Sequence, residues 1–351
     1  MSCSGYRKVN SAGPLRSVLA LGGVGSVPPR LSGFVQGSLV LTAGRPKGLG
    51  AARSSAPNGP VCRHRRRWQL LVLASLVAAC PARTLADFAR ALDCYHSRRF
   101  TEARDLFRQV EAARPADPEI DFYLGRLALW FDEAEEGRSR LERAVAARPG
   151  EARLRLALGD ACGLLAQQAP LLSKLRWARR CREEYERAVA LDPASIDARW
   201  ALLGFSAIAP RLAGGSPERA RREAAEIARL DALEGRIARG TLALIEGAPA
   251  SAFAEFDDLL AREPDHFIAL YHIGRCAALS GKDVRRGIDA LRRCLELSPP
   301  AGENRPGHAH VHHRLAELLE RDGRSVEAAV SRAAVRRLEP DFRAEKTALR
   351  N

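Results

Sequence analysis

A recurring pattern of proline and small residues constrains the fold of this chain more than any other feature. Seven segments end at closing residues that stand at Pro115, Pro149, Pro193, Ala232, Pro264, Pro299 and Pro340. Twelve residues before each closing residue stands a small one: Ala103, Gly137, Cys181, Ala220, Ala252, Gly287 and Ala328. Small side chains at a fixed offset allow the two helices of a hairpin to approach closely. The pattern therefore predicts seven stacked units, each a helical hairpin.

The segment from Pro118 to Pro149 shows this pattern in full. Gly125 marks one amphipathic helix and Gly137 a second, and Pro149 follows Pro115 by 34 residues, the period of a helix-turn-helix solenoid. The segment resembles a tetratricopeptide repeat. The resemblance implies an all-α fold, a right-handed superhelical solenoid of about seven such units that covers residues 87–341 and is followed by a capping helix and tail at 342–351.

Insertions interrupt the period at three places. The intervals between closing residues are 34, 44, 39, 32, 35 and 41, so the extra residues fall in the third, fourth and seventh units. In the third unit Pro170 should break a lengthened hairpin. In the fourth, Ser216 and Pro217 are typical of a helix start, and the Gly214-Gly215 pair before them lacks the lysine of a phosphate-binding loop. The inserted units, with the pattern SK, ALDP, AP and GGS between Ser173 and Ser216, resemble exported bacterial tetratricopeptide proteins of unassigned function.

The charge of the chain lies mostly in its first quarter. The formal net charge is +14, yet residues 1–86 carry 12 basic groups and no acidic group, which leaves a net charge of only +2 on residues 87–351. A nucleic-acid-binding domain needs a concentrated excess of positive charge. The repeat region therefore has no expected nucleic-acid partner.

The first 86 residues read as a leader rather than as part of the fold. Residues 1–60 are rich in Gly, Ser, Pro and Ala, so we expect a disordered or mis-annotated N-terminal extension. Residues 61–86 have the layout of a signal peptide, with basic residues from Arg63 to Arg67 and an apolar run from Leu70 to Ala79. That run is too short for a transmembrane helix.

Two processing sites compete within the leader. Thr84-Leu85-Ala86 fits a cleavage site before Asp87, whereas the residues up to Cys80 resemble a bacterial lipobox. A lipid on Cys80, or an uncleaved signal, would tether the protein to a membrane. We expect a periplasmic or envelope-associated protein; the alternative is a mitochondrial transit peptide, because such segments are also rich in Arg and poor in acids.

The resemblance also implies where a partner would bind. In tetratricopeptide proteins the first helix of each unit lines a concave groove that holds a protein or peptide. The corresponding residues here are Phe88, Phe122, Arg126, Arg153, Trp200, Tyr271 and Arg275. Aromatic and Arg side chains dominate interface hot spots, and this mixture suits a polypeptide with apolar anchors and acidic neighbours. The alternative is that some of the rings complete the packing between helices, since the register can slip by one residue.

Other candidate sites rest on histidine, cysteine and arginine. A run with His308, His310, His312 and His313 could supply imidazole ligands to a metal, but it contains no carboxylate. Its other interpretation is as surface and groove residues. Cys162 and Cys181 lie at about equal distances from the turn at Pro170 and could form a disulfide in an oxidising compartment. The basic run from Lys174 to Arg182 is typical of a solvated helix face, with an acidic partner or anionic lipid as the alternative.

The repeat region contains no GxSxG, HExxH, CxxC, dinucleotide-binding or kinase motif. We therefore expect no enzyme activity and no cofactor. The sequence favours a non-catalytic scaffold in the bacterial envelope that binds a protein or peptide in its groove. The alternative is a metal-binding or metal-responsive module that uses the His308–His313 run.

Overall fold

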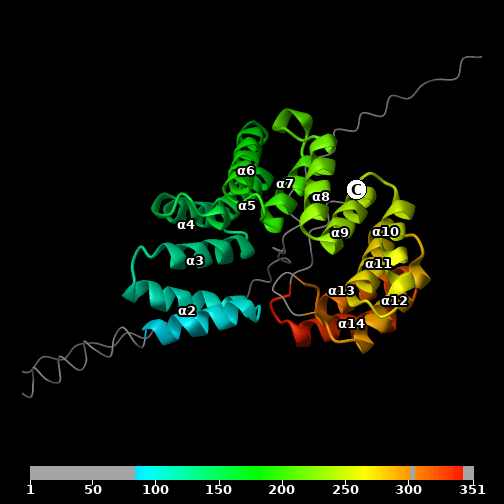
Figure 1. Cartoon of the computed structure of the whole chain (residues 1–351). Coiled ribbons are helices and arrows are strands. Elements are labelled where there is room, and N and C mark those ends of the chain that lie inside the picture. Colours follow the sequence, from blue (N-terminus) through cyan, green and yellow to red (C-terminus); the bar gives the residue numbers. More distant parts are fainter. Residues whose placement is uncertain (1–83, 301–304, 343–351) are drawn as a thin grey trace, which may run out of the picture. The chain divides into compact units, whose positions relative to one another are not determined.

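The computed structural model describes residues 84–300 and 305–342, and these residues form helices and connecting turns with no strand among them (Figure 1). The first helix covers residues 84–96. The later elements are α2 (Phe100–Ala113), α3 (Pro118–Trp130), α4 (Ala134–Ala147), α5 (Ala152–Gln168), α6 (Leu171–Leu191), α7 (Ile196–Ile208), the 3₁₀ turn η1 (Arg211–Ala213), α8 (Pro217–Leu230), α9 (Ala232–Ile245), α10 (Pro249–Arg262), α11 (Phe267–Ser280), α12 (Val284–Glu296), α13 (His308–Arg321) and α14 (Ser325–Leu338).

The helices pair in chain order into the seven predicted hairpins. The first helix pairs with α2, and the following hairpins run from α3 with α4 to α13 with α14. The all-α repeat fold predicted from the spacing is confirmed. Within each hairpin we call the two members the first and the second helix of a unit.

Small residues mark the contact between the two helices of every hairpin. All seven small residues that stand twelve before the closing residues are buried. On the first helices the glycines face bulky side chains: a Cβ added to Gly125 would lie 2.7 Å from Leu141 Cγ, and one added to Gly274 would lie 2.3 Å from Leu291 Cγ. A Cβ at either glycine would have to displace the facing leucine side chain, so the sequence pattern reflects a steric constraint.

The insertions lengthen or reshape individual units, as the sequence predicts. Helices α5 and α6 are 17 and 21 residues long and meet at Pro170. In the fourth unit Gly214 adopts a φ of 97°, which favours glycine, and Ser216 then caps α8 by accepting a hydrogen bond from the Arg219 backbone N–H. The glycine-serine sequence is therefore a helix start.

The first helices lie closer to one another than the second helices do. The backbones of α3, α5, α7, α9 and α11 each approach the next first helix within 8 Å, whereas among the described residues no second helix approaches the next second helix in this way. Arginine side chains span the wider gap with ion pairs: Arg140 to Glu111, Arg180 to Glu142, Arg219 to Glu186, Arg286 to Asp257, and Arg292 to Glu327. The first helices thus form a continuous side of the array.

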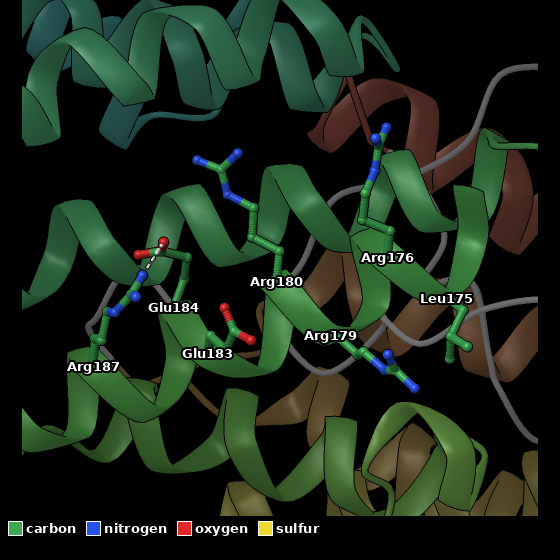
Figure 2. A pocket seen from close by; sticks show the side chains of 7 residues that line it. All are labelled: Leu175, Arg176, Arg179, Arg180, Glu183, Glu184 and Arg187. Atoms are coloured by element: carbon green, nitrogen blue, oxygen red, sulfur yellow. Dashed lines mark hydrogen bonds and ion pairs between the residues drawn. The ribbon is translucent and has the colours of Figure 1, made fainter. Parts of the chain in front are cut away.

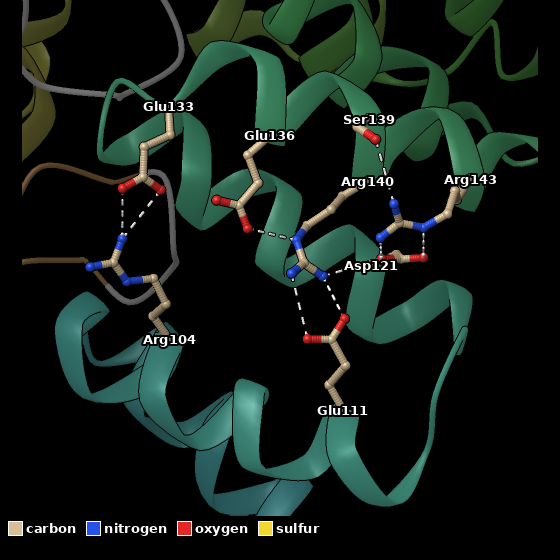
Figure 3. Close-up of polar contacts among 8 residues, drawn as sticks. All are labelled: Arg104, Glu111, Asp121, Glu133, Glu136, Ser139, Arg140 and Arg143. Atoms are coloured by element: carbon tan, nitrogen blue, oxygen red, sulfur yellow. Dashed lines mark hydrogen bonds and ion pairs between the residues drawn. The ribbon is translucent and has the colours of Figure 1, made fainter.

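A buried carboxylate joins the first two units (Figure 3). Asp121 on α3 is 4% exposed, and its Oδ2 accepts a hydrogen bond of 3.0 Å from Arg143 Nε on α4. Arg140, also on α4, lies 3.4 Å from Asp121 and donates to Glu111 on α2 and to Glu136 on its own helix. The network therefore links α2, α3 and α4 through charge-assisted hydrogen bonds.

Some predictions fall outside the described residues. The leader up to residue 83, with Cys80, and the tail 343–351 are among them. Thr84, Leu85 and Ala86, the alternative cleavage site, lie at the start of the first helix. Phe342, predicted to begin a capping helix, follows a turn and contacts the rings of His310 and His313. No helix in the described ranges has the length and apolar character needed to cross a bilayer.

Candidate functional site

The first helices present a surface built from equivalent positions of successive units. We call it the first-helix face, and its principal residues are Glu119, Phe122, Arg126, Arg153, Asp160, Trp200, Glu234, Thr241, Tyr271 and Arg275. Contacts on this face join residues about one repeat apart, because equivalent positions of neighbouring first helices lie side by side.

The second and third units meet through an arginine over an aromatic ring. The Arg153 guanidinium lies 4.8 Å from the centroid of the Phe122 ring, and it donates two hydrogen bonds of 2.8 and 2.6 Å to Glu119. The Arg126 guanidinium lies 5.8 Å from the centroid of the same ring. The hydrogen bonds from Arg153 lower the pKa of Glu119, so both members of the pair are charged at neutral pH.

The fourth and fifth units meet through Trp200 and Glu234. The indole Nε1 of Trp200 donates a hydrogen bond of 3.0 Å to Glu234 Oε2, and the ring packs between two hydrophobic clusters. The other oxygen, Glu234 Oε1, lies 2.6 Å from Arg305 Nη1. Arg305 belongs to the connection before α13, so the seventh-unit insertion places its guanidinium on the first-helix face.

Three predicted groove residues are buried instead of open to a partner. Phe122, Tyr271 and Arg275 are 5%, 4% and 6% exposed. Arg275 Nη1 lies 3.4 Å from the Thr241 hydroxyl on the preceding first helix. The physical reason at Tyr271 and Arg275 is that α11 packs against both α9 and α13. At Phe122, the Arg126 and Arg153 guanidinium groups lie over the ring. These side chains complete helix packing, the alternative that the sequence allowed.

The other four predicted groove residues keep part of their surface accessible. Phe88, Arg126 and Trp200 are half-buried, and Arg153 is exposed. The Phe88 ring makes edge contacts with Phe107 and Tyr123, which fixes it against the first hairpin. Of these four residues, Arg126, Arg153 and Trp200 lie on the consecutive first helices α3, α5 and α7, and their binding role stays a prediction.

The basic run on α6 lines a shallow hollow of about 620 Å³ (Figure 2). Its lining residues are Leu175, Arg176, Arg179, Arg180, Glu183, Glu184 and Arg187. Arg180 pairs with Glu142 on α4 at 2.7 Å, and Arg187 pairs with the buried Glu184 at 2.7 Å. Acidic side chains thus neutralise much of the positive charge of the basic run, as expected for a solvated helix face.

Comparison with known protein families decides the classification. Residues 95–161, which cover the end of the first helix, α2, the second unit and part of α5, match the family model for the tetratricopeptide repeat (TPR). These residues of the chain therefore contain tetratricopeptide repeat sequence. TPR arrays are protein–protein interaction scaffolds and are generally non-catalytic. No curated protein matches the sequence significantly.

Solved structures similar to this chain come from several organisms. A thermophilic TPR protein of Thermus thermophilus is 18% identical, with a TM-score of 0.47, and the match covers 60% of this chain and 99% of that one. A TPR protein of Parabacteroides merdae is 11% identical, with a TM-score of 0.45, over 74% and 98% of the two chains. Yeast Tom70 is 14% identical, with a TM-score of 0.49, over 69% and 48%.

Three histidine side chains of the seventh unit each contact a different polar group. His308 Nε2 lies 2.9 Å from the Leu297 carbonyl, His310 Nδ1 accepts from the Gly307 backbone N–H, and His313 lies 3.8 Å from Glu317. Burial lowers the pKa of His312, which favours its neutral form. Within the described ranges, no group of three or more His, Cys, Asp or Glu side chains is arranged to hold a metal ion.

The cysteines are buried parts of the hydrophobic core. Cys162 and Cys181 are both fully buried and are free thiols, so the disulfide that the sequence allowed is not formed in this structure. Burial raises the pKa of Cys162 to about 12. A thiol with so high a pKa is a poor nucleophile. The two residues act as small apolar groups between α5 and α6.

Asp160 is a titratable group on the first-helix face that the sequence did not single out. Its Oδ1 accepts a hydrogen bond of 2.7 Å from the hydroxyl of Tyr185, which is fully buried on α6. Burial, together with a smaller effect of Asp197, raises the pKa of Asp160 to about 6 against the opposing effects of Tyr185 and Arg126.

Replacing Asp160 with asparagine should flatten the pH dependence of folding stability. The folded chain holds this proton more tightly than the unfolded chain, whose pKa is near 3.8. The resulting stabilisation is therefore fully present below about pH 4 and is lost as the pH rises through about 6. Relative to the variant, the wild type should lose about 1–2 kcal/mol of unfolding free energy between about pH 5 and pH 8, discounted for partial exposure. Parallel pH profiles in urea titrations would contradict this assignment.

Proposed function

We propose that this TPR protein is a non-catalytic scaffold of the bacterial envelope that binds an extended polypeptide along its first-helix face. The observation that carries the proposal is the continuity of this face: Arg153 joins Phe122 and Glu119 across one unit boundary, and Trp200 joins Glu234 across another. A ligand lying across α3, α5 and α7 would meet the accessible side chains of Arg126, Arg153 and Trp200, and arginine and tryptophan are enriched at interface hot spots.

The charges on this face indicate the mode of binding. Arg153 is paired with Glu119, and Glu234 is paired with Arg305, so the face is not dominated by one sign of charge. The partner we propose has apolar anchors and acidic side chains. One of its carboxylates could replace Glu119 in the ion pair with the exposed Arg153. Exchange of partly exposed ion pairs costs little, because each such pair contributes only about 0–1 kcal/mol.

Charge reversal on the first-helix face tests this function. An Arg126→Glu, Arg153→Glu variant should stay folded and lose about tenfold or more in the capture of its envelope partners, because interfacial charges of the wrong sign repel a ligand. Captured proteins are quantified by mass spectrometry against wild-type protein, and helicity is followed by circular dichroism.

A matched control carries the same charge change on the second helices. Arg222 and Arg285 are exposed on α8 and α12, away from the first-helix face. The Arg222→Glu, Arg285→Glu variant should capture partners as the wild type does. If both double variants lose the same partners, or neither loses any, the first-helix face is not the binding surface.

The envelope location rests on the leader. The basic residues from Arg63, the apolar run to Ala79 and the small residues before Asp87 support export through a signal peptide. Mass spectrometry of the mature N-terminus from the native host should find either Asp87 or a lipid-modified Cys80. A mature protein that retains residues 61–79 and sits in the cytoplasm would overturn the location while leaving the groove experiment intact.

A further inference from the structure

The outer side of the second helices changes character in the last unit. Two positions, fourteen and ten residues before the closing residue, are exposed in all seven units. In the first six units the earlier position holds Thr101, Glu135, Arg179, Glu218, Ala250 and Arg285, and the later one holds Asp105, Ser139, Glu183, Arg222, Ala254 and Asp289. In the seventh unit both positions are valine, Val326 and Val330.

These valines belong to an apolar stripe along α14. Val326 is 78% exposed and Val330 is 66% exposed. Ala329 and Ala333 are also exposed and complete the spacing i, i+3, i+4, i+7, which places all four side chains on one face of the helix. We call these four residues the α14 stripe. The other units carry polar side chains or alanine at the two equivalent positions, so the stripe is the most apolar part of this side of the second helices.

Continuation of the array would leave the α14 stripe uncovered. The equivalent positions on α12, Arg285 and Asp289, remain exposed although the seventh unit follows them. The same holds for Ala250 and Ala254 on α10, which the sixth unit follows. A further first helix stacked on the seventh unit in the same way would therefore lie on a different side of α14. An occupant of the stripe would therefore approach from outside the array.

The charges at the two ends of α14 complement those of a second, antiparallel copy of the same helix. Glu327 stands near the N-terminal end, and although it accepts from Arg324 and Arg292, half of its side chain is exposed. Arg336 and Arg337 are exposed at the C-terminal end, and neither forms an ion pair within the described residues. Antiparallel pairing of two α14 helices places the Glu327 end of one beside the Arg336–Arg337 end of the other, whereas parallel pairing places like charges together.

We propose that two copies of this chain associate through antiparallel contact of their α14 stripes. A two-fold axis near the middle of the helix places Ala329 of one copy opposite Ala333 of the other, and these small residues allow close approach while the valines fill the flanks. A single pair of helices buries less than the roughly 1,200 Å² typical of stable complexes, so the dimer forms in the micromolar range. This proposal does not depend on the partner-binding role of the first-helix face.

Sedimentation of the full chain measures the association directly. Wild-type protein should shift from one chain to two as its concentration rises through the micromolar range. A Val330→Asp variant should weaken the association by about tenfold or more, because it places a charge in the apolar contact. Ala254→Asp is the matched control, since it introduces the same side chain at the same offset of the fifth unit, and it should associate as the wild type does.

Mixing charge variants separates a second copy from any other occupant. Glu327→Arg alone, and Arg336→Glu, Arg337→Glu alone, should each be monomeric, while an equal mixture of the two should form a heterodimer. Melting temperatures confirm that all variants are folded. A wild-type chain that stays monomeric throughout the micromolar range overturns the proposal, as does a mixture that fails to associate; in those cases another protein, or residues 1–83 or 343–351 of the chain, covers the stripe.

Discussion

A Gly274→Leu variant should unfold at a markedly lower temperature than the wild type, with a loss of about 3 kcal/mol or more in unfolding free energy. Even a Cβ at this position would lie 2.3–2.7 Å from three carbon atoms of Leu291, whose side chain is fully buried between α11 and α12. The hairpin can accept a larger residue only by separating its helices. Because each repeat is stabilised by its neighbours, the fifth and seventh units should also lose protection in hydrogen exchange.

The control for this variant is a glycine that faces open space. A Cβ added to Gly150, in the turn between α4 and α5, meets no atom within 4 Å, and its φ lies outside the left-handed region. Gly150→Leu should therefore change the unfolding free energy by less than about 0.5 kcal/mol. Equal melting temperatures for Gly274→Leu and the wild type would show that the helix contact is not as close as the structure describes.

The sequence predicted the hairpins because their contacts repeat at short, fixed offsets. Four first-helix glycines at equivalent positions, Gly125, Gly159, Gly240 and Gly274, each meet a side chain of the second helix in the same unit. Because these contacts repeat at a fixed spacing, the residues that form them recur periodically along the sequence. The turn at Pro170 and the cap at Ser216 were predictable for the same reason, since their chemistry lies within a few residues.

The surface of the first helices could be predicted only in part. Its register follows from the repeat, but exposure depends on how far one unit rotates against the next, and no local pattern gives that rotation. Tyr271 and Arg275 therefore proved to be buried, while Trp200 at an equivalent place is half-buried. Glu234 was missed although a signal existed: it follows Trp200 by 34 residues, the same spacing that separates Glu119 from Arg153.

Arg305 was beyond prediction from the sequence. Its contact with Glu234 spans 71 residues and depends on the path of an insertion whose length matches no repeat. The redox state of Cys162 and Cys181 was also beyond prediction from the sequence. Their equal distance from a turn is compatible both with a disulfide and with two packed thiols. The offset of Cys181, a small-residue position in every unit, was the better guide to its role.

An Asp121→Ala variant should lose about 2–3 kcal/mol of unfolding free energy, because it removes a buried acceptor from the network that joins the first two units. Arg140, of which only 14% is exposed, would keep Glu111 and Glu136 but lose the nearby Asp121 carboxylate. Arg143 is half-exposed and can return to water, so the loss should be smaller than for a pair buried on both sides. Asp105→Ala, at an exposed position on α2, is the matched control and should be close to neutral.

A double-mutant cycle then separates the ion pair from the cavity left by Asp121. If the charge-assisted bonds account for the loss, Asp121→Ala and Arg143→Ala should couple by about 1 kcal/mol or more in urea titrations, and the double variant should be more stable than the sum of the single losses implies. Salt should change this coupling only slightly, because the carboxylate is shielded from solvent. Coupling below about 0.3 kcal/mol, the scatter of independent sites, would mean that Asp121 stabilises the hairpin through its volume and not through its charge.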